Sequence, residues 1–468
     1  MVRRRQRERS LFEVLLPDGH KLWPDWLRRI DTLLEDEAVI EVVAQALEAR
    51  WPQSRRRGRP GTPADVVIRM LILKHLFDWS YDDLEQEVRA NLVYRAFTRI
   101  DAEAVPDAKT ILKIARALGP EVIAQLHRTV VEVAKRAGVT RGRRFRIDTT
   151  VVETNVHYPT DSTLLQDGVR VLTRTMQRAS AALGDEPHRL RNRLRSVTRG
   201  VLRIGYHARS PKTRDALVES YKKLMATTRA VVRDADTMIR RIGQRRRTAP
   251  TGTGAVLAQA QQHLRQMRPL VQRVVAQAKA RLLGGDTHVP DKVLSIFEPH
   301  TTTIRKGKIS KPTEFGNLVT IQEAEHQIIT AYEVHAGRPA DVTLWTPALD
   351  RHQALFGRAP HLAAGDRGFS SAANEHAATD RGVRRVVLPR RGPKSDARRA
   401  YERQAWFRRG QRWRVGCEGR ISVIKRRHGL RRCRYRGADG MARWVGLGVI
   451  ADNLRNTAAF VNARAATT

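Results

Sequence analysis

Two acidic residues in a strongly basic chain have the type and setting that metal-dependent chemistry on phosphate requires. Asp148 in FRIDTTVVETN and Asp366 in HLAAGDRGFSS each follow an apolar run typical of a β-strand. Carboxylate oxygens are hard ligands that suit Mg²⁺. Two such ions, about 4 Å apart, can activate a water or a 3′-hydroxyl on one side of a phosphorus and stabilise the leaving oxygen on the other. Taken alone, either aspartate is more often a strand-end cap or a turn residue. A third acidic residue is therefore needed to distinguish a metal site from two structural aspartates.

Glu418 is the third candidate. It lies in RWRVGCEGRISVIKRRHGLRRCRYRG, which we predict to be largely helical. Arg414, Glu418 and Lys425 are separated by four and by seven residues, which places all three on one face of a helix. The glutamate could then join the metal site, and Lys425, two turns away, could meet a phosphate. The alternative is an ordinary surface row of ion pairs, which contributes little to stability.

The charge balance indicates a polyanionic partner. The chain of 468 residues has 87 Lys and Arg against 48 Asp and Glu, a formal net charge of +39. Such an excess opposes compaction unless a polyanion shares the surface, and nucleic acid gains affinity from each cation that displaces counterions from a phosphate. A high-GC coding bias would explain Arg in place of Lys, but not so large an excess over acids. We therefore expect nucleic-acid binding.

Other features of the composition restrict the cellular setting. Cys417 and Cys433 are too few for a disulfide framework or a zinc finger. The basic start MVRRRQRERS precedes an apolar run that Pro17 and Asp18 soon interrupt, unlike a signal peptide. No stretch approaches the roughly 18 apolar residues that span a bilayer. We expect a cytoplasmic, nucleoid-associated protein with no membrane partner.

The elements that must position these residues follow from the hydrophobic pattern. Apolar residues recur at helical spacing over 25–50, 81–97 and 110–137, and Pro63 marks a further helix start. We therefore predict that the first 140 residues are helical. A β-rich segment begins at Arg143 and contains Asp148. Helical patterns return over 163–293, and strand patterns follow in LVTIQEAEHQIITAYEVHAG, LAAGDRGF and RRVVLP before two closing helices. This order predicts an α/β fold with a mixed sheet flanked by helices.

The helical regions leave two questions of role open. Residues 1–140 could form a DNA-binding domain of the helix-turn-helix kind, or a packing or dimerisation domain. The basic insertion, about 161–297, has cations on several faces and, we expect, too few apolar stripes for a core of its own. It would then gain order from DNA or a second subunit, with phosphates meeting Arg191, Arg193, Arg195 and Arg199. The alternative is a structural helical hairpin that supports the sheet.

The segments around the three acids resemble bacterial insertion-sequence transposases of the DDE superfamily, particularly the ISNCY-like group with an InsH-like helical N-terminal region. DTTVVETNVHYPTDSTLLQDGVRVL is similar to the family's first-aspartate block, and GDRGFSS to its second. The family signature near the catalytic glutamate is Tyr, two residues, Arg, three residues, Glu, six residues, Lys. Arg414, Glu418 and Lys425 match this spacing, whereas Gln411 stands at the tyrosine position.

The resemblance implies a ribonuclease-H-like catalytic domain over 141–468, interrupted by the insertion. Asp148 would lie mid-sheet, Asp366 after a neighbouring strand and Glu418 on a later helix. These three would bind two Mg²⁺ ions, for which Mn²⁺ can substitute, while Arg414 and Lys425 orient and neutralise phosphate. The implied partners are terminal inverted repeats and target DNA, bound by a homo-oligomer.

The function expected from the resemblance is DNA transposition, that is, binding of the ends of an insertion sequence followed by metal-dependent strand cleavage and strand transfer. One alternative is a ribonuclease-H-like nuclease that hydrolyses but never joins strands. Another is a domesticated DNA-binding protein, which would be expected to have lost at least one of the three acids.

Overall fold

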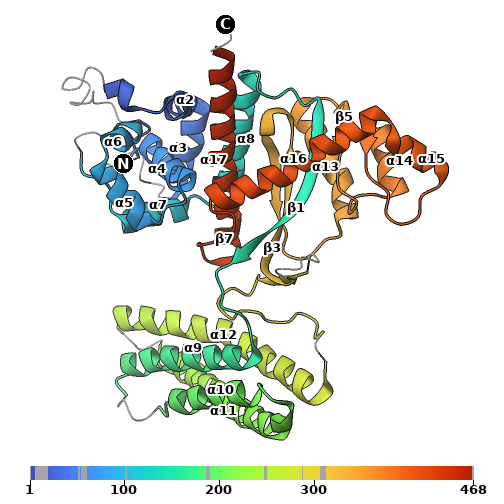
Figure 1. The fold of residues 1–468 in the computed structure, drawn as a ribbon. Helices are drawn as coiled ribbons and strands as arrows, with labels where there is room; N and C mark the ends of the chain where they lie inside the picture. Colours follow the sequence, from blue (N-terminus) through green and yellow to red (C-terminus); the bar gives the residue numbers. More distant parts are fainter. Residues whose placement is uncertain are drawn as a thin grey trace. The chain divides into compact units, whose positions relative to one another are not determined.

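The computed structural model describes residues 2–5, 19–50, 53, 61–100, 103–185, 190–246, 250–286, 288–305 and 312–465. The chain forms two compact units (Figure 1). One comprises Met1–Asn155 together with Ile304–Thr468, and the other comprises Val156–Thr303. In the described ranges, no helix combines the length and the apolar character needed to cross a membrane.

A mixed β-sheet organises the first unit. Its strands are β1 (Arg144–Thr154), β2 (Thr302–Ile304), β3 (Glu314–Glu323), β4 (Ile329–Val334), β5 (Leu362–Ala364), β6 (Arg385–Val387) and β7 (Arg432–Cys433). The order is β2-β3-β1-β5-β6, with β4 also paired to β3 and β7 to β1. β1 is antiparallel to β3 and parallel to β5 and β7, and β6 is parallel to β5. The prediction of a mixed α/β architecture is thereby confirmed.

Alternating side chains of β1 face different helices, because successive strand residues point to opposite faces of a sheet. Phe145 and Ile147 pack against α13 (Asp341–Phe356). Val152 belongs to a cluster that includes residues of α16 (Ala405–Arg427) and α17 (Gly437–Ala465). Asp148 comes four residues before Val152, an even number, so the two side chains point to the same face of the sheet, the one that α16 covers. The remaining short elements of this region are η4 (Glu325–Gln327), α14 (Ala372–Asp380) and α15 (Asp396–Arg403).

The helices before β1 are shorter than the sequence periods suggested. They are η1 (Gly19–Leu22), α2 (Asp25–Leu34), α3 (Glu37–Arg50), α4 (Ala64–Leu76), α5 (Tyr81–Ala90), α6 (Leu92–Phe97), α7 (Ala108–Ala117) and α8 (Pro120–Arg136). Each expected period is divided where a residue starts a new helix. Asp36 accepts a hydrogen bond from Ala38 N, and Asn91 accepts from Val93 N and Tyr94 N, so both act as N-caps. Pro120 opens α8.

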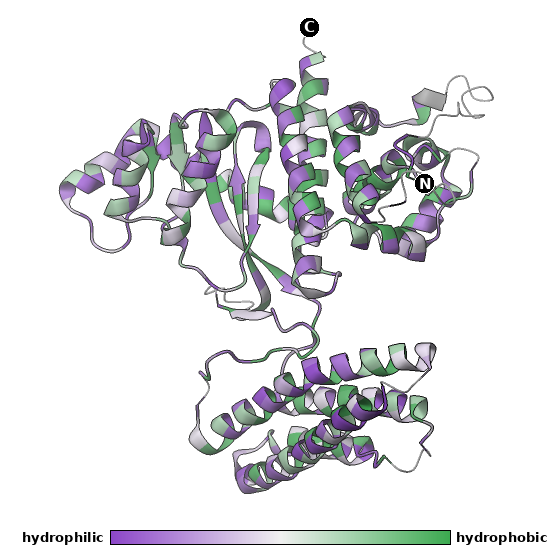
Figure 2. Ribbon diagram, turned by 180° about the vertical axis from the view of Figure 1, so that it is seen from behind, coloured by the Kyte–Doolittle hydropathy of each residue, from purple (hydrophilic) through white to green (hydrophobic). Residues whose placement is uncertain are grey.

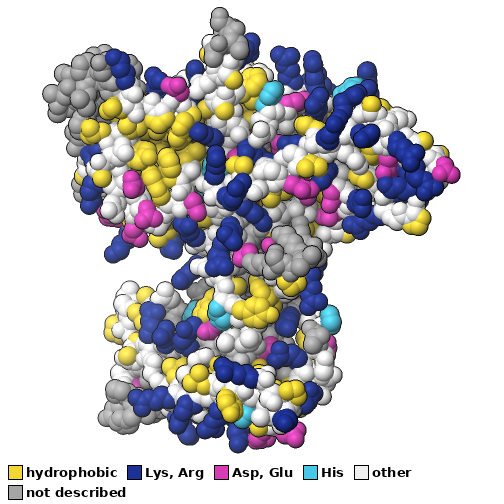
Figure 3. All heavy atoms as spheres, viewed as in Figure 1, with side chains coloured by type: hydrophobic (Ala, Val, Ile, Leu, Met, Phe, Trp, Pro, Cys, Tyr) yellow, Lys and Arg dark blue, Asp and Glu magenta, His cyan; other side chains and the backbone are white. Residues whose placement is uncertain are grey.

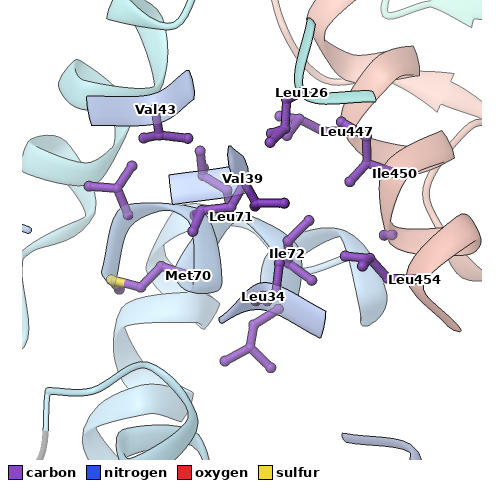
Figure 4. Packing of buried hydrophobic residues seen from close by; sticks show 14 of the residues in the cluster. Leu34, Val39, Val43, Met70, Leu71, Ile72, Leu126, Leu447, Ile450 and Leu454 are labelled. Carbon is purple, nitrogen blue, oxygen red and sulfur yellow. The ribbon is translucent and has the colours of Figure 1, made fainter. Parts of the chain in front are cut away.

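These helices share a hydrophobic core with the C-terminal helix α17 (Figure 4). Leu34 of α2, Leu71 of α4 and Leu126 of α8 are fully buried in a cluster with Leu447 and Ile450 of α17. The sequence predicted a boundary near residue 140, whereas the structure keeps the helices and the sheet in one compact unit. The physical reason is that α17 is apolar on several sides and so packs against both the N-terminal helices and the sheet.

The second unit has a core of its own, so the expectation of too few apolar stripes was wrong. It contains α9 (Asp161–Ala182), α10 (Leu194–His207), η3 (Pro211–Thr213), α11 (Arg214–Arg245) and α12 (Thr251–Gly284). Its helices are striped by hydropathy (Figure 2). In α11 the buried positions recur every three or four residues, at Leu224, Thr228, Val231, Ala235, Met238 and Ile242. A narrow apolar stripe on each helix is enough, because four helices contribute side chains to one common core. The cationic side chains occupy the other faces of these helices.

One of the four arginines expected to meet phosphates has an internal partner. Arg193 is half-buried and forms an ion pair with Asp234 of α11. Arg191, Arg195 and Arg199 are exposed. DNA contact by the three exposed side chains stays a prediction.

Because residues 156–303 have their own core, we expect this fragment to fold when excised. It should show helical circular dichroism and a cooperative thermal transition. A fragment of residues 1–140 is the comparison, and we expect it to melt without cooperativity because it lacks α17, which covers one side of its core. A non-cooperative 156–303 fragment would contradict the assignment of an independent core.

Candidate active site

Asp148 lies in the middle of the central strand. β1 has the sequence RFRIDTTVVET, rich in β-branched residues that favour a pleated, buried surface. The Asp148 side chain is 13% exposed, and Oδ1 accepts a hydrogen bond of 2.7 Å from Thr149 N. The pairing partner across the antiparallel ladder is Ile321 of β3. A carboxylate is thus held at a fixed position on a rigid element, beside apolar neighbours.

Asp366 follows β5, the parallel neighbour of β1, two residues after the strand ends. Each paired residue of β1 lies opposite the residue 218 positions later, as in Arg146 opposite Ala364. Asp148 and Asp366 have the same separation, 366 − 148 = 218, two residues beyond the last pair. Ala364, the last residue of β5, packs with Phe407 of α16. Since adjacent strands run about 4.8 Å apart, we expect the two aspartates to lie at neighbouring positions if this register continues for two residues beyond its last pair.

The turn after β5 brings in a fourth acid that the sequence analysis missed. Gly368 N donates a 2.7 Å hydrogen bond to Asp366 Oδ1. A Cβ atom at Gly368 would lie 2.5 Å from Asp341 Oδ2 and 2.8 Å from Asp366 Oδ1, so only glycine allows this close approach. Asp341 opens α13, and its Oδ1 accepts a 3.2 Å hydrogen bond from the Thr149 hydroxyl. The only local signal for Asp341 was an acid at a helix start, which many helices have.

Helix α16 carries the other three predicted site residues. It is continuous over Ala405–Arg427, which confirms the helix on which their shared face was predicted. The Arg414 guanidinium lies 2.7 Å from Glu418 Oε1 and 3.7 Å from Asp148 Oδ2, and so connects the two acids. Arg414 is 14% exposed, whereas the Glu418 side chain is 58% exposed. Lys425 is half-buried further along α16.

A buried ion pair anchors α16 on the sheet. Arg146, two residues before Asp148, forms an ion pair with Glu323 of β3 and donates a hydrogen bond to the Trp413 carbonyl oxygen. Its guanidinium also lies 4.7 Å from the centroid of the Trp413 ring. Glu323 is fully buried, and burial raises the pKa of its carboxyl despite the opposing effect of Arg146. The pair fixes the helical turn that precedes Glu418.

Cys417, next to Glu418 in sequence, faces into this core and is fully buried. Burial, followed by the nearby carboxylates of Glu323 and Asp148, raises the pKa of its thiol well above the ordinary value. The thiol is therefore protonated at neutral pH. A protonated, buried thiol is neither a nucleophile nor a metal ligand, so the chemistry of this site belongs to its carboxylates.

The donor chemistry of the site suits Mg²⁺, since Asp148, Asp366 and Glu418 offer only carboxylate oxygens. The two aspartates come from the neighbouring strand β1 and the turn after β5, and Arg414 connects Glu418 to Asp148. Within the described ranges, however, no three His, Cys, Asp or Glu side chains lie close enough to one another to hold a metal ion. Joint coordination by the three acids stays a prediction.

Two known domain families match parts of this chain. Residues 12–117 match a family described as a transposase domain. Residues 376–458 match a family described as a transposase DDE domain. The second match contains Arg414, Glu418 and Lys425, whereas Asp148 and Asp366 lie outside it. Neither description specifies the ISNCY-like subgroup that the motifs resemble.

The chain is also similar to a curated protein, "Uncharacterized protein ORF8 in nfe locus" of Rhizobium meliloti. The two are 25% identical over 177 residues, which cover 35% of this chain and 86% of that protein. No solved structure matches. Two separate parts of the chain are thus similar to transposase domains, and the second of them is a DDE domain.

Proposed function

We propose that this protein binds the ends of an insertion sequence, cleaves DNA there and joins the freed 3′ end to target DNA. The observation that carries the proposal is the position of Arg414 of α16, which lies 2.7 Å from Glu418 and 3.7 Å from Asp148 of the central strand, while Asp366 follows the parallel neighbour of that strand. The strongly basic chain supports DNA as the substrate (Figure 3).

The sheet topology supports a ribonuclease-H-like catalytic fold. The central strand β1 has the antiparallel pair β3–β4 on one side and the parallel strands β5 and β6 on the other. The first aspartate lies on the central strand, the second follows its parallel neighbour, and the glutamate comes from a later helix. This is the arrangement that the family resemblance implies.

In the proposed reaction, Asp148, Asp366 and Glu418 hold two Mg²⁺ ions. When bound, such ions make the attacking oxygen nucleophilic and stabilise the leaving oxygen. Arg414 and Lys425 neutralise and orient the phosphate. In cleavage, a water oxygen bonds to phosphorus, the bond from phosphorus to the 3′ oxygen breaks, and that oxygen takes a proton. In joining, the freed 3′-hydroxyl bonds to a target phosphorus and displaces a target 3′-hydroxyl, so one phosphodiester replaces another without ATP.

A strand-transfer assay tests this function. The purified protein is mixed with Mg²⁺, a supercoiled target plasmid and a labelled duplex that carries the terminal sequence of its own element with the 3′ end already cut. We expect label to become covalently joined to the plasmid. Hydrolysis without joining would instead indicate a nuclease, and DNA binding without either reaction would indicate a domesticated DNA-binding protein.

A further inference from the structure

A basic hollow in the first unit is lined by residues of α4, α5, α7, α17 and the segment that follows β7. Its cavity volume is about 950 Å³. Six of its lining residues are cationic, namely Lys74, Lys109, Arg116, Arg434, Arg436 and Arg443. Only Asp82 and Asp439 oppose them in the lining, and none of the candidate active-site residues lines the hollow. The cavity therefore has an unbalanced positive charge that favours an anion.

Lys74 at the end of α4 is the buried cation of this hollow. The residue is 2% exposed. Its ammonium lies over three aromatic rings, at 4.9 Å from the centroid of Tyr81, 5.3 Å from that of Tyr435 and 4.6 Å from that of Trp444. Among the residues that the structure describes, no carboxylate lies within 4.0 Å of this ammonium. Ring faces offset only part of the cost of burying a cation, which leaves Lys74 suited to receive an anion.

The positive charge continues along α7. Lys109, Lys113 and Arg116 are spaced by four and three residues and share one exposed face of this helix. A second hollow, of about 450 Å³, is lined by Arg50, Lys109, Lys113 and Arg116 and so adjoins the first. The helix rises about 10 Å between Lys109 and Arg116, about the rise of three base pairs of DNA. The ligand that fits this shape is an elongated polyanion.

We propose that this basic strip, made of Lys109, Lys113 and Arg116 of α7 with Lys74 in the floor of the adjoining hollow, binds the phosphate backbone of DNA. The choice of DNA as the polyanion rests on the proposed function. The strip lies in the part of the chain that matches the first transposase domain, residues 12–117. It gives the N-terminal helices a DNA-binding role, in preference to a purely packing or dimerising one.

Proton uptake should accompany binding at Lys74. Burial, followed by the charge of Arg434, lowers the pKa of Lys74 to about 7. An anion beside the amine favours its charged form and raises this pKa. Binding thus takes up a proton above about pH 7, and affinity should fall as pH rises through that range. The titratable and charged groups that face Lys74 are His75, Asp78, Tyr81, Asp82, Asp83, Cys433, Arg434, Tyr435 and Arg443.

Fluorescence anisotropy with the full chain and a short, labelled, mixed-sequence duplex tests the strip. The variant K109A/R116A should bind roughly tenfold more weakly or worse. It should also lower the slope of log affinity against log salt by about two, one for each phosphate contact removed. The matched control is R89A, an arginine on the neighbouring α5 whose side chain is 64% exposed. We expect R89A to bind like the wild type.

The variant Lys74→Met tests the floor of the hollow. Between about pH 6 and about pH 9, the wild type should lose affinity more steeply than this variant. Unchanged affinity and salt slope in K109A/R116A would overturn the proposal, and this holds even where Lys74→Met fails to fold. An acidic protein that competes for the strip while DNA does not would also overturn it. If the wild type binds the duplex but neither cuts nor joins DNA, this result would contradict the proposed function but not the proposal that the strip binds DNA.

Discussion

The substitution Asp148→Asn is expected to abolish DNA strand cleavage while DNA binding survives. Asparagine keeps the size of the side chain and can still accept from Thr149 N, so β1 should keep its pairing. The charge needed to bind a divalent ion is lost. Loss of a residue that only supports a metal ligand costs about 10–100-fold, so loss of a ligand should cost more than about a hundredfold in cleavage rate. The measurement is single-turnover cleavage of a labelled terminal duplex with Mg²⁺, alongside anisotropy for binding.

Asp380→Asn provides the matched control, because Asp380 is an acid of the same unit whose side chain is 57% exposed at the end of α14. It should cleave at the wild-type rate. Asp366→Asn should behave like Asp148→Asn if the two aspartates serve one metal site. Wild-type cleavage by Asp148→Asn would exclude Asp148 as a ligand and, with it, the proposed active site.

The sequence was sufficient to predict those parts of the site that depend on local spacing. Arg414, Glu418 and Lys425 share a helix face because the helical period fixes it, and α16 is continuous through all three. Asp148 and Asp366 were predicted from the apolar runs before them, and these runs form β1 and β5. The pairing of β1 with β5 could not be predicted, because register is a property of the paired strands and not of either one.

Features that depend on contacts between distant segments escaped the prediction. Asp341 and Asp366 both lie against Gly368, where a side chain would meet their carboxylates, although the two aspartates are 25 residues apart in sequence, 366 − 341 = 25. Leu447 and Ile450 of α17 complete the core of helices that lie more than 300 residues earlier, as 447 − 126 = 321 for Leu447 and Leu126. From the sequence we placed a domain boundary where the pattern changes from helix to strand. In the fold, a domain boundary lies where few contacts join the two parts of the chain.

The second large effect concerns the ion pair beneath the site. We expect Arg146→Met to lower the free energy of unfolding by about 3–5 kcal/mol, because it leaves the fully buried Glu323 without its charge partner. Methionine fills a similar space but cannot donate to the Trp413 carbonyl, so α16 also loses a contact one turn before Glu418. Cleavage activity should fall together with stability. Denaturant-induced unfolding of the full chain measures the loss.

Arg144→Met is the matched control, since Arg144 lies two residues earlier on the same face of β1 and is exposed. It should change stability by no more than about 0.5 kcal/mol. The double variant Arg146→Met with Glu323→Met should recover most of the loss, because neither charge of this buried pair then remains.

The dependence on pH gives an independent check. The pKa of Glu323 is raised by burial, so the folded state takes up a proton more readily than the unfolded state. The contribution of this group to stability therefore grows as pH falls and is lost as pH rises through the raised pKa. Without Arg146 the shift should be larger, because the arginine opposes it. Arg146→Met should thus lower the free energy of unfolding, relative to Arg144→Met, by the largest amount near neutral pH. This difference should shrink as pH is lowered. A cost that is small at neutral pH, or that the double variant does not relieve, would contradict the role of the pair in holding α16 on the sheet.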